Sequence, residues 1–283
     1  MTNRLKAYGI VPRKSLGQNF LIEEATARRI VDAAEIRSND LVFEIGPGGG
    51  ALTKHLTKRA GRVVAIELDQ ALIPALRDEL GGAQNVSIVH GDALEVDFSR
   101  LAREAEQVFG KPFDAVRFVA NLPYYITSAA IRRILECRLP VAAAVLTVQT
   151  EVAERVTAQP PHMSLLAVSV QFYGRPEIMF KIPPSQFYPQ PEVESAVLRI
   201  KPHAQPLSSD AQGFFRVVKA GFSQPRKQLR NTLAAGLGMD KARVESALRS
   251  SGIDPSRRAE TLSLEEWERL TLTLCQKQNR SPS

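Results

Sequence analysis

The tetrapeptide Asn121-Leu122-Pro123-Tyr124 combines a side-chain amide, a stiff turn and an aromatic ring. An aromatic amine such as N6 of adenine is a poor nucleophile, because its lone pair is delocalised into the ring. Two acceptors on the amino hydrogens, here the Asn121 side-chain oxygen and the Leu122 carbonyl, would favour a pyramidal and more reactive nitrogen. Pro123 would stiffen the turn, and Tyr124 would stack on a base turned out of its helix. Such a site needs no general base; the same four residues also fit an ordinary turn after a strand.

A second stretch, residues 41–56, reads as a buried strand, a glycine turn and the start of a helix. Glycine at 46 and 48 would allow positive φ angles and close approach of a ligand to the backbone. Together with Ala51, Gly46 and Gly48 fit the G-x-G-x-x-G/A pattern of nucleotide-binding turns. Glu67 lies about 20 residues further on, where an acid would hold ribose hydroxyls. From this pattern alone, a turn that only packs a helix on a strand stays open.

Gly46, Glu67, Asp92 and Asn121 each fall at or just after the end of a run that reads as a strand. The carboxyl ends of parallel strands meet at one edge of a sheet, and ligands of α/β proteins bind at that edge. We therefore expect these four residues to line a single nucleotide site.

Strands and helices alternate up to residue 201, which predicts a doubly wound, Rossmann-like α/β fold with a parallel sheet. The predicted strands are 41–45, 62–69, 86–90, 115–120, 142–148, 165–172 and 195–200, and the predicted helices are 22–34, 51–56, 70–80, 128–137 and 151–157. After 202 only helix patterns follow, at 211–222, 226–236, 240–251 and 263–276, the last with a capping box at 263–266. We predict an α/β domain at 1–201 and a small helical domain at 202–283.

The chain of 283 residues carries a formal net charge of +7, which suggests a polyanionic partner such as RNA. Arg13 and Lys14 form one basic group, and Arg226, Lys227 and Arg230 form another, which we expect on neighbouring helical positions. Both groups could grip phosphates.

No apolar run approaches the roughly 20 residues of a membrane span, and the N-terminus lacks the apolar core of a signal peptide. We therefore expect a cytoplasmic protein. Cys137 and Cys275 are far apart and the histidines are scattered, so the sequence predicts no metal site and no disulfide framework. Without a heptad pattern or an obvious pairing strand, we expect a monomer.

Two further segments allow more than one interpretation. The proline-rich segment 183–191 could present Phe187 and Tyr188 as a stacking platform for a base, or could bury one ring in the core. In the N-terminal segment, Gln18 and Asn19 could offer their amides to a ligand, or could belong to a basic arm anchored by its apolar residues.

Taken together, these motifs resemble the ribosomal RNA adenine N6,N6-dimethyltransferases, and most of all their bacterial small-subunit branch, associated with kasugamycin sensitivity. The similarity spans almost the whole chain. The motifs that carry it are 18–21 (Gln-Asn-Phe-Leu), 44–48 (Glu-Ile-Gly-Pro-Gly), 66–69 (Ile-Glu-Leu-Asp), 91–93 (Gly-Asp-Ala), 121–124, 183–191, 226–231 and 252–260.

The resemblance implies S-adenosylmethionine as cofactor and two adjacent adenosines near the 3′ end of 16S rRNA, in the small ribosomal subunit, as substrate. The cofactor-binding residues it implies are Gln18, Asn19, Leu21, Glu44, Gly46, Gly48, Glu67, Asp92 and Asn121. Glu67 would take the ribose hydroxyls and Asp92 the adenine amine, while Asn19 and Leu21 would close over the cofactor. Asn121, Leu122, Pro123 and Tyr124 would hold the target adenine, with Phe187 as a second stacking face.

Three positions depart from the family pattern: Thr150, Pro225 and the triplet 162–164 (His-Met-Ser). They lie outside the cofactor motifs and bear on rRNA docking. Three other interpretations stay open at this point. They are a 23S rRNA methyltransferase of the erythromycin-resistance type, a ribosome-assembly factor that acts mainly by binding, and a nicotinamide dehydrogenase.

Overall fold

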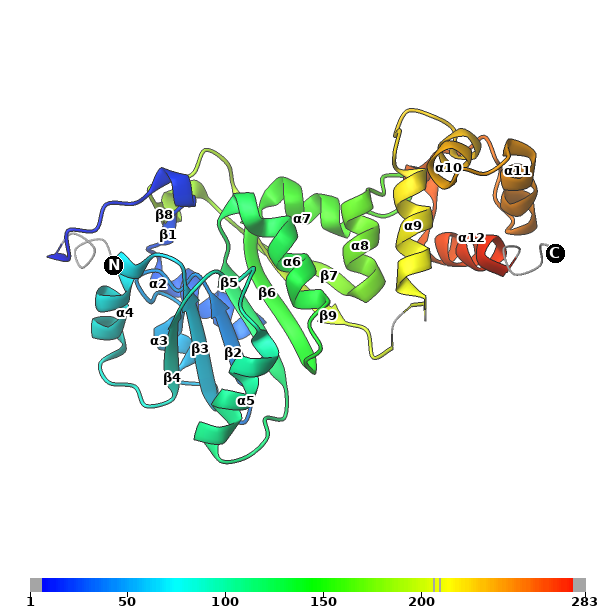
Figure 1. The fold of residues 1–283 in the computed structure, drawn as a ribbon. Coiled ribbons are helices and arrows are strands. Elements are labelled where there is room, and N and C mark those ends of the chain that lie inside the picture. The colour runs from blue at the N-terminus through cyan, green and yellow to red at the C-terminus, as the bar shows by residue number, and fades with distance from the viewer. Residues whose placement is uncertain (1–6, 206, 209, 277–283) are drawn as a thin grey trace. The chain divides into compact units, whose positions relative to one another are not determined.

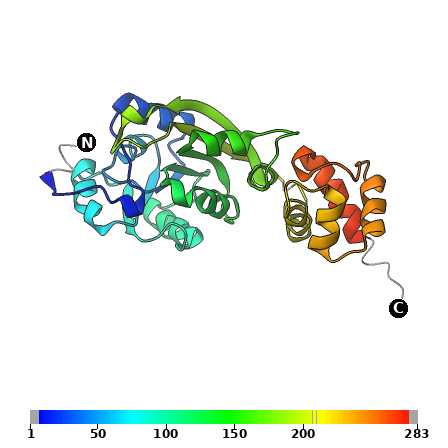
Figure 2. The ribbon, with the colours of Figure 1, turned by 90° about the horizontal axis from the view of Figure 1, so that it is seen from above.

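The computed structural model describes residues 7–205, 207–208 and 210–276, and its chain divides into two compact units (Figure 1, Figure 2). The first unit holds the residues up to Ala153 together with Pro176–Pro202. The second holds Glu154–Arg175 and the residues from His203 onward. The predicted division at 201/202 lies beside the last boundary, but it assigned Glu154–Arg175 to the first domain. The polar tail 277–283 and the Cys275 side chain lie outside the described residues.

Within the described residues, a seven-stranded sheet of order β4-β3-β2-β5-β6-β9-β7 forms the first unit's centre (Figure 1). The strands are β2 (Leu41–Ile45), β3 (Arg62–Glu67), β4 (Val86–His90), β5 (Val116–Asn121), β6 (Val141–Gln149), β7 (Gly174–Ile182) and β9 (Ser195–Pro202). Strands β4 to β6 in this order run parallel, and β9 runs antiparallel to β6. The predicted doubly wound α/β fold is confirmed.

The central strand β2 is buried on both faces of the sheet, since its alternate residues point to opposite sides and all of them are buried. The helices of this unit are α2 (Glu24–Ala33), α3 (Thr53–Leu56), α4 (Ile73–Leu80), α5 (Phe98–Phe109) and α6 (Thr127–Leu135), and α7 (Thr150–Thr157) spans the boundary between the two units. Val42 packs in a cluster with α2 and α3. Its neighbour Phe43 instead stacks on Phe118 at 5.2 Å and meets Phe98 of α5 edge-on. This two-sided burial explains why β2 is apolar at every position except Glu44.

The register of the parallel strands brings their carboxyl ends level. Ile45 at the end of β2 lies opposite Ile66 of β3 and Ala120 of β5. The residues that come next, Glu67 and Asn121, therefore reach the same edge of the sheet.

A separate two-stranded sheet ties the N-terminal segment to the proline-rich loop. β1 (Phe20–Leu21) pairs antiparallel with β8 (Phe187–Tyr188), so that Leu21 lies opposite Phe187. Short 3-10 turns precede each strand, η1 (Lys14–Leu16) before β1 and η4 (Pro184–Gln186) before β8.

The prediction of a strand at 165–172 is wrong, since these residues form the helix α8 (Leu165–Tyr173). Ser164 caps the helix, accepting a hydrogen bond from the Ala167 amide. The helix is buried on several sides, with Val168, Val170 and Phe172 all inaccessible. An apolar helix of this kind shows no 3.6-residue period, so its pattern cannot be told from that of a buried strand. The strand that follows is β7, which was not predicted.

The second unit packs its helices around Trp267, whose side chain is fully buried. Its other helices, besides α8, are α9 (Ala211–Gly221), α10 (Leu229–Leu237), α11 (Lys241–Ser250) and α12 (Leu264–Gln276), with the turn η5 (Ala259–Thr261). The predicted capping box is confirmed: the Ser263 amide donates to Glu266, and the Glu266 amide donates to the Ser263 hydroxyl. The start of α10 differs from prediction, because the helix begins only at Leu229, after Gln228 as N-cap.

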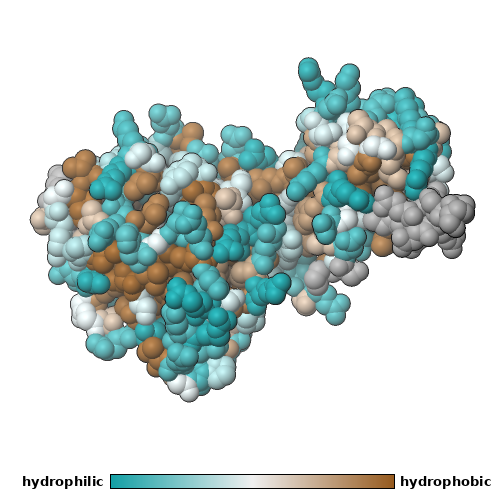
Figure 3. Space-filling model, viewed as in Figure 1, coloured by the Kyte–Doolittle hydropathy of each residue, from teal (hydrophilic) through white to brown (hydrophobic). Residues whose placement is uncertain are grey.

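No helix among the described residues is long and apolar enough to cross a membrane. The face of the molecule seen in Figure 3 mixes hydrophilic and hydrophobic residues.

Candidate functional site

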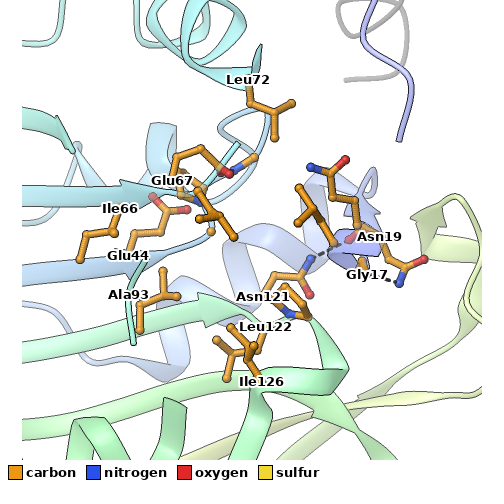
Figure 4. Close-up of a pocket in the computed structure, with 18 of the residues that line it drawn as sticks. Gly17, Asn19, Glu44, Ile66, Glu67, Leu72, Ala93, Asn121, Leu122 and Ile126 are labelled. Carbon is orange, nitrogen blue, oxygen red and sulfur yellow. Dashed lines mark hydrogen bonds between the residues drawn. The ribbon is translucent and has the colours of Figure 1, made fainter. Parts of the chain in front are cut away.

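A cavity of about 190 Å³ opens at the carboxyl edge of the first unit's sheet (Figure 4). The loops after β2, β3, β4 and β5 line it, together with the N-terminal segment 16–21. The predicted residues that the structure brings together here are Gln18, Asn19, Leu21, Glu44, Gly46, Gly48, Glu67, Asp92, Asn121, Leu122, Pro123 and Tyr124. Phe187 and the five basic residues singled out in the sequence are not among the lining residues.

The glycine turn has the positive φ angles that its sequence predicts, +69° at Gly46 and +56° at Gly48. A Cβ atom on Gly46 would have only the Asn121 carbonyl within 4 Å, so the backbone there faces open space. The amides of the turn are nevertheless occupied: Gly46 donates to the Ile66 carbonyl and Gly48 to the Glu67 carboxylate. A pyrophosphate would need such amides free. The turn therefore suits a nucleoside better than a dinucleotide, which argues against the nicotinamide dehydrogenase.

Glu67 joins the glycine turn to the loop after β3. One carboxylate oxygen accepts from the Gly48 amide at 2.9 Å, and the other accepts from the Asp69 amide at 2.8 Å. Burial raises the pKa of Glu67, an effect that these backbone hydrogen bonds oppose. Since each carboxylate oxygen can accept a second hydrogen bond, both stay able to receive a hydroxyl. The vicinal hydroxyls of a ribose present two such donors.

Two other carboxyl groups line the cavity. Asp92 accepts from the Leu94 amide through one oxygen, and its other oxygen has no partner among the described residues. Glu44 is 1% exposed, and one of its oxygens is buried without a hydrogen-bond partner in the described structure. Burial, together with repulsion from Glu67, raises the pKa of Glu44 to about 8. A buried carboxyl group of this kind favours a positively charged ligand, which would compensate its ionised form.

Gln18 fixes the N-terminal segment against the loop after β3. Its amide nitrogen donates to Asp69 at 2.9 Å, and its amide oxygen accepts from the Arg13 backbone amide at 2.8 Å. The Arg13 guanidinium also pairs with Asp69 at 3.2 Å. Gln18 thus lines the cavity, but both ends of its side-chain amide bond other residues of the protein. The sequence had suggested that this amide could bind a ligand.

Asn121 at the end of β5 is held by the same segment. Its amide nitrogen donates to the Asn19 carbonyl at 2.8 Å, a bond that Figure 4 marks between the two residues. Because a carbonyl only accepts, the NH₂ group must face Asn19. The Asn121 side-chain oxygen is therefore directed away from Asn19 and stays available as an acceptor.

The next three residues complete the turn. The Leu122 amide donates to the Thr147 carbonyl of β6, whereas no described residue donates to the Leu122 carbonyl. The Ile126 amide donates to the Pro123 carbonyl, at the end of η3 (Tyr124–Ile126). The Tyr124 hydroxyl lies 2.9 Å from the Ser195 hydroxyl, and burial raises the pKa of Tyr124. The turn thus offers two acceptors and an anchored aromatic ring.

Phe187 is placed differently from the sequence interpretation that made it a stacking face. It is 3% exposed and packs in the cluster that contains Leu21, Ile182 and Val197. Besides Tyr124, the cavity is lined by the aromatic residues Phe20 and Tyr125, and sequence reasoning missed Tyr125. The only signal for it was its position directly after the Asn-Leu-Pro-Tyr motif.

Four of the five basic residues singled out in the sequence are exposed, and two of the five, Arg13 and Arg230, pair with carboxylates. Arg13 and Lys14 lie on the exposed turn at η1, and Arg226 and Lys227 lie exposed in the turn before α10. The expectation that the latter two occupy helical positions is wrong. Arg230 lies within α10 and pairs with Glu245 at 3.2 Å.

No cluster of metal-ligating side chains occurs among the described residues.

Comparison with known proteins agrees with this geometry. The family described as "Ribosomal RNA adenine dimethylase" matches residues 11–276. A Moorella thermoacetica protein named ribosomal RNA small subunit methyltransferase A is 46% identical over 270 residues, 94% of this chain and 93% of that protein. The Dehalococcoides mccartyi protein of the same name is 44% identical over 273 residues, 95% of this chain and 90% of that protein.

Solved structures show the same fold. The 23S rRNA methyltransferase ErmE superposes with a TM-score of 0.71 at 30% identity, over 91% of this chain and 100% of that one. A dimethyladenosine transferase from Plasmodium falciparum reaches a TM-score of 0.78 at 24% identity, over 92% and 98% of the two chains. The chain belongs to the ribosomal RNA adenine dimethylase family and is an S-adenosylmethionine-dependent methyltransferase.

Proposed function

We propose that this enzyme methylates N6 of two adjacent adenosines near the 3′ end of 16S rRNA, placing two methyl groups on each. Its substrate is the small ribosomal subunit during maturation, and it acts as a monomer in the cytoplasm. The names of the two relatives that match almost the whole chain support this choice.

The 23S rRNA alternative has less support. The relative that acts on 23S rRNA is 30% identical, against 46% and 44% for the small-subunit methyltransferases. Leu122 and the segments 226–231 and 252–260 are also features that the resemblance assigns to the small-subunit branch. The cavity argues against an assembly factor that only binds, because its polar groups are arranged for both a cofactor and an acceptor base.

The cavity residues fit the methyl donor. The remaining acceptor capacity of Glu67 suits the ribose hydroxyls, and the free oxygen of Asp92 suits the adenine amine. The unpartnered oxygen of Glu44 supplies negative charge for a cation. When bound, S-adenosylmethionine supplies a methyl group activated by a positively charged sulfur.

The single observation that carries the catalytic proposal is the hydrogen bond from Asn121 to the Asn19 carbonyl. It leaves the Asn121 side-chain oxygen as one acceptor for the adenine amino group, and the Leu122 carbonyl is the second. Two accepted hydrogen bonds favour a pyramidal nitrogen with its lone pair available for attack. Tyr124, held by Ser195, offers a ring for the target base. The nitrogen can lose its proton after the transfer, so that orientation and proximity supply the catalysis.

Docking of rRNA is assigned to exposed cations. Arg226 and Lys227 are exposed, whereas Arg230 is paired with Glu245. We therefore propose only Arg226 and Lys227 as docking residues of the second unit. Arg13 and Lys14 come shortly before the segment 16–21 that lines the cavity, and they would bind phosphates close to the target base, although the Arg13 guanidinium also pairs with Asp69.

The substrate can be tested with labelled S-adenosylmethionine and small and large ribosomal subunits that lack their own modifications. We expect label in small-subunit rRNA as N6,N6-dimethyladenosine. Asn121→Ala should lower transfer by about 100-fold or more, because one preorganised acceptor is lost. Asn39→Ala removes a half-buried asparagine that bonds Lys111 and should transfer normally. Label confined to the large subunit would contradict the substrate assignment.

Docking can be tested with the double variant Arg226→Glu, Lys227→Glu. Small-subunit affinity should fall, and the dependence of log affinity on log salt should weaken by about one unit for each lost phosphate contact. Arg100→Glu with Arg103→Glu on α5 makes the same charge change and should have little effect. Equal losses in both double variants would mean that only total charge matters, which would refute the docking assignment.

The raised pKa of Glu44 predicts that cofactor binding depends on pH. The free protein holds a proton on Glu44 below a pH of about 8. A cation bound in the cavity lowers this pKa, so binding releases the proton. Affinity for S-adenosylmethionine should therefore increase as pH rises from 6 to 8, by at most about tenfold per unit, and then level off.

Calorimetric titration at several pH values measures this effect. S-adenosylhomocysteine has the same amino acid group without the positive sulfur, and its affinity should change less with pH. Glu44→Gln should flatten the dependence for S-adenosylmethionine. An unchanged slope in that variant would rule out Glu44 as the titrating group.

A further inference from the structure

Tyr125 combines two properties that the fold itself does not require. Its side chain is 61% exposed, which makes it the most exposed aromatic residue among those described. It nevertheless lines the cavity, directly after Tyr124 in η3. A large exposed ring gains little from the core, so its position at the mouth of a nucleic-acid enzyme's site points to a ligand.

The ring is braced by the N-terminal segment. A Cβ atom on Gly17 would lie 3.3 Å from Cδ1 and 3.5 Å from Cε1 of Tyr125, so this edge of the ring rests against the Gly17 backbone. Gly17 has a φ of +59° and ends η1, with its amide donating to the Lys14 carbonyl. A ring held along one edge, with most of its surface open, loses little freedom when a base stacks on it.

The turn that braces Tyr125 also carries positive charge. Arg13 and Lys14 are exposed there; Arg13 pairs with Asp69, and Lys14 has no carboxylate partner among the described residues. An aromatic ring beside cations is the combination by which proteins bind single-stranded nucleic acid, since the ring takes a base and the cations take the phosphates.

The two consecutive tyrosines differ in a way that matches two consecutive nucleotides. Tyr124 is half-buried and anchored by Ser195, beside the acceptors of the target amine. Tyr125 lines the same cavity but is far more exposed than Tyr124. We infer that Tyr125 is a positioning residue that stacks on the base next to the flipped adenine, which in the proposed substrate is the second adenosine of the pair. This inference rests on the proposed function and extends it to the neighbouring nucleotide.

The test compares Tyr125→Ala and Tyr125→Phe in methyl transfer to small subunits, together with the dissociation constant of S-adenosylmethionine. Tyr125→Ala should raise the KM for subunits between about fivefold and a hundredfold, as loss of one base stack predicts. Tyr125→Phe keeps the ring and should remain near the wild type. Cofactor affinity should be unchanged in both, and Tyr8→Ala, which removes another exposed ring, should be neutral.

Two results would overturn the inference: an unchanged KM in Tyr125→Ala, or an equal loss in Tyr125→Phe. The wild-type enzyme reports on the proposed function separately, through the subunit that it labels. If it labels only large subunits, the proposed substrate is wrong, and the same comparison of variants on large subunits still decides the role of Tyr125.

Discussion

The hydrogen bond from the Asn121 amide to the Asn19 carbonyl is the contact on which the proposed catalytic site depends. It joins the end of β5 to a segment 102 residues earlier in the chain. That segment is fixed in turn by Gln18 and Arg13, which both bind Asp69 after β3. The orientation of the Asn121 amide is therefore set by the register of the parallel strands and by a clamp, the polar contacts of Gln18 and Arg13 with Asp69. Without the clamp, the amide could rotate and present hydrogens where an acceptor is needed.

Buried carboxyl groups define what the cavity can bind. Glu44 and Glu67 are both nearly inaccessible, and burial raises the pKa of each. The amides of Gly46 and Gly48, which could otherwise hold a phosphate, are occupied by the protein. The site thus favours a nucleoside that carries positive charge over a dinucleotide with a pyrophosphate. The glycine pattern in the sequence is compatible with a nucleoside and with a dinucleotide. The hydrogen-bond partners of the glycine amides distinguish between the two ligands.

The common location of the predicted cofactor residues could be predicted from the sequence, whereas several of their neighbours' contacts could not. Gly46, Glu67, Asp92 and Asn121 could be brought to one edge because each lies at or just after the carboxyl end of a strand, and that rule depends only on local patterns. Three features depend on contacts distant in sequence and could not be predicted: the partners of Gln18, the burial of Phe187, and the ion pair of Arg117 with Asp40, 77 residues apart. Helix α8 was mistaken for a strand because a helix buried on several sides has no amphipathic period.

Replacement of Asn121 by aspartate tests the central claim most directly. Aspartate has nearly the same shape, but it puts an acceptor opposite the Asn19 carbonyl and so removes the bond that orients the side chain. The account predicts that Asn121→Asp retains cofactor binding but transfers methyl groups to small subunits at least about 100-fold more slowly. Transfer at the wild-type rate would contradict the account, because it would mean that an acceptor at position 121 suffices without the orienting bond.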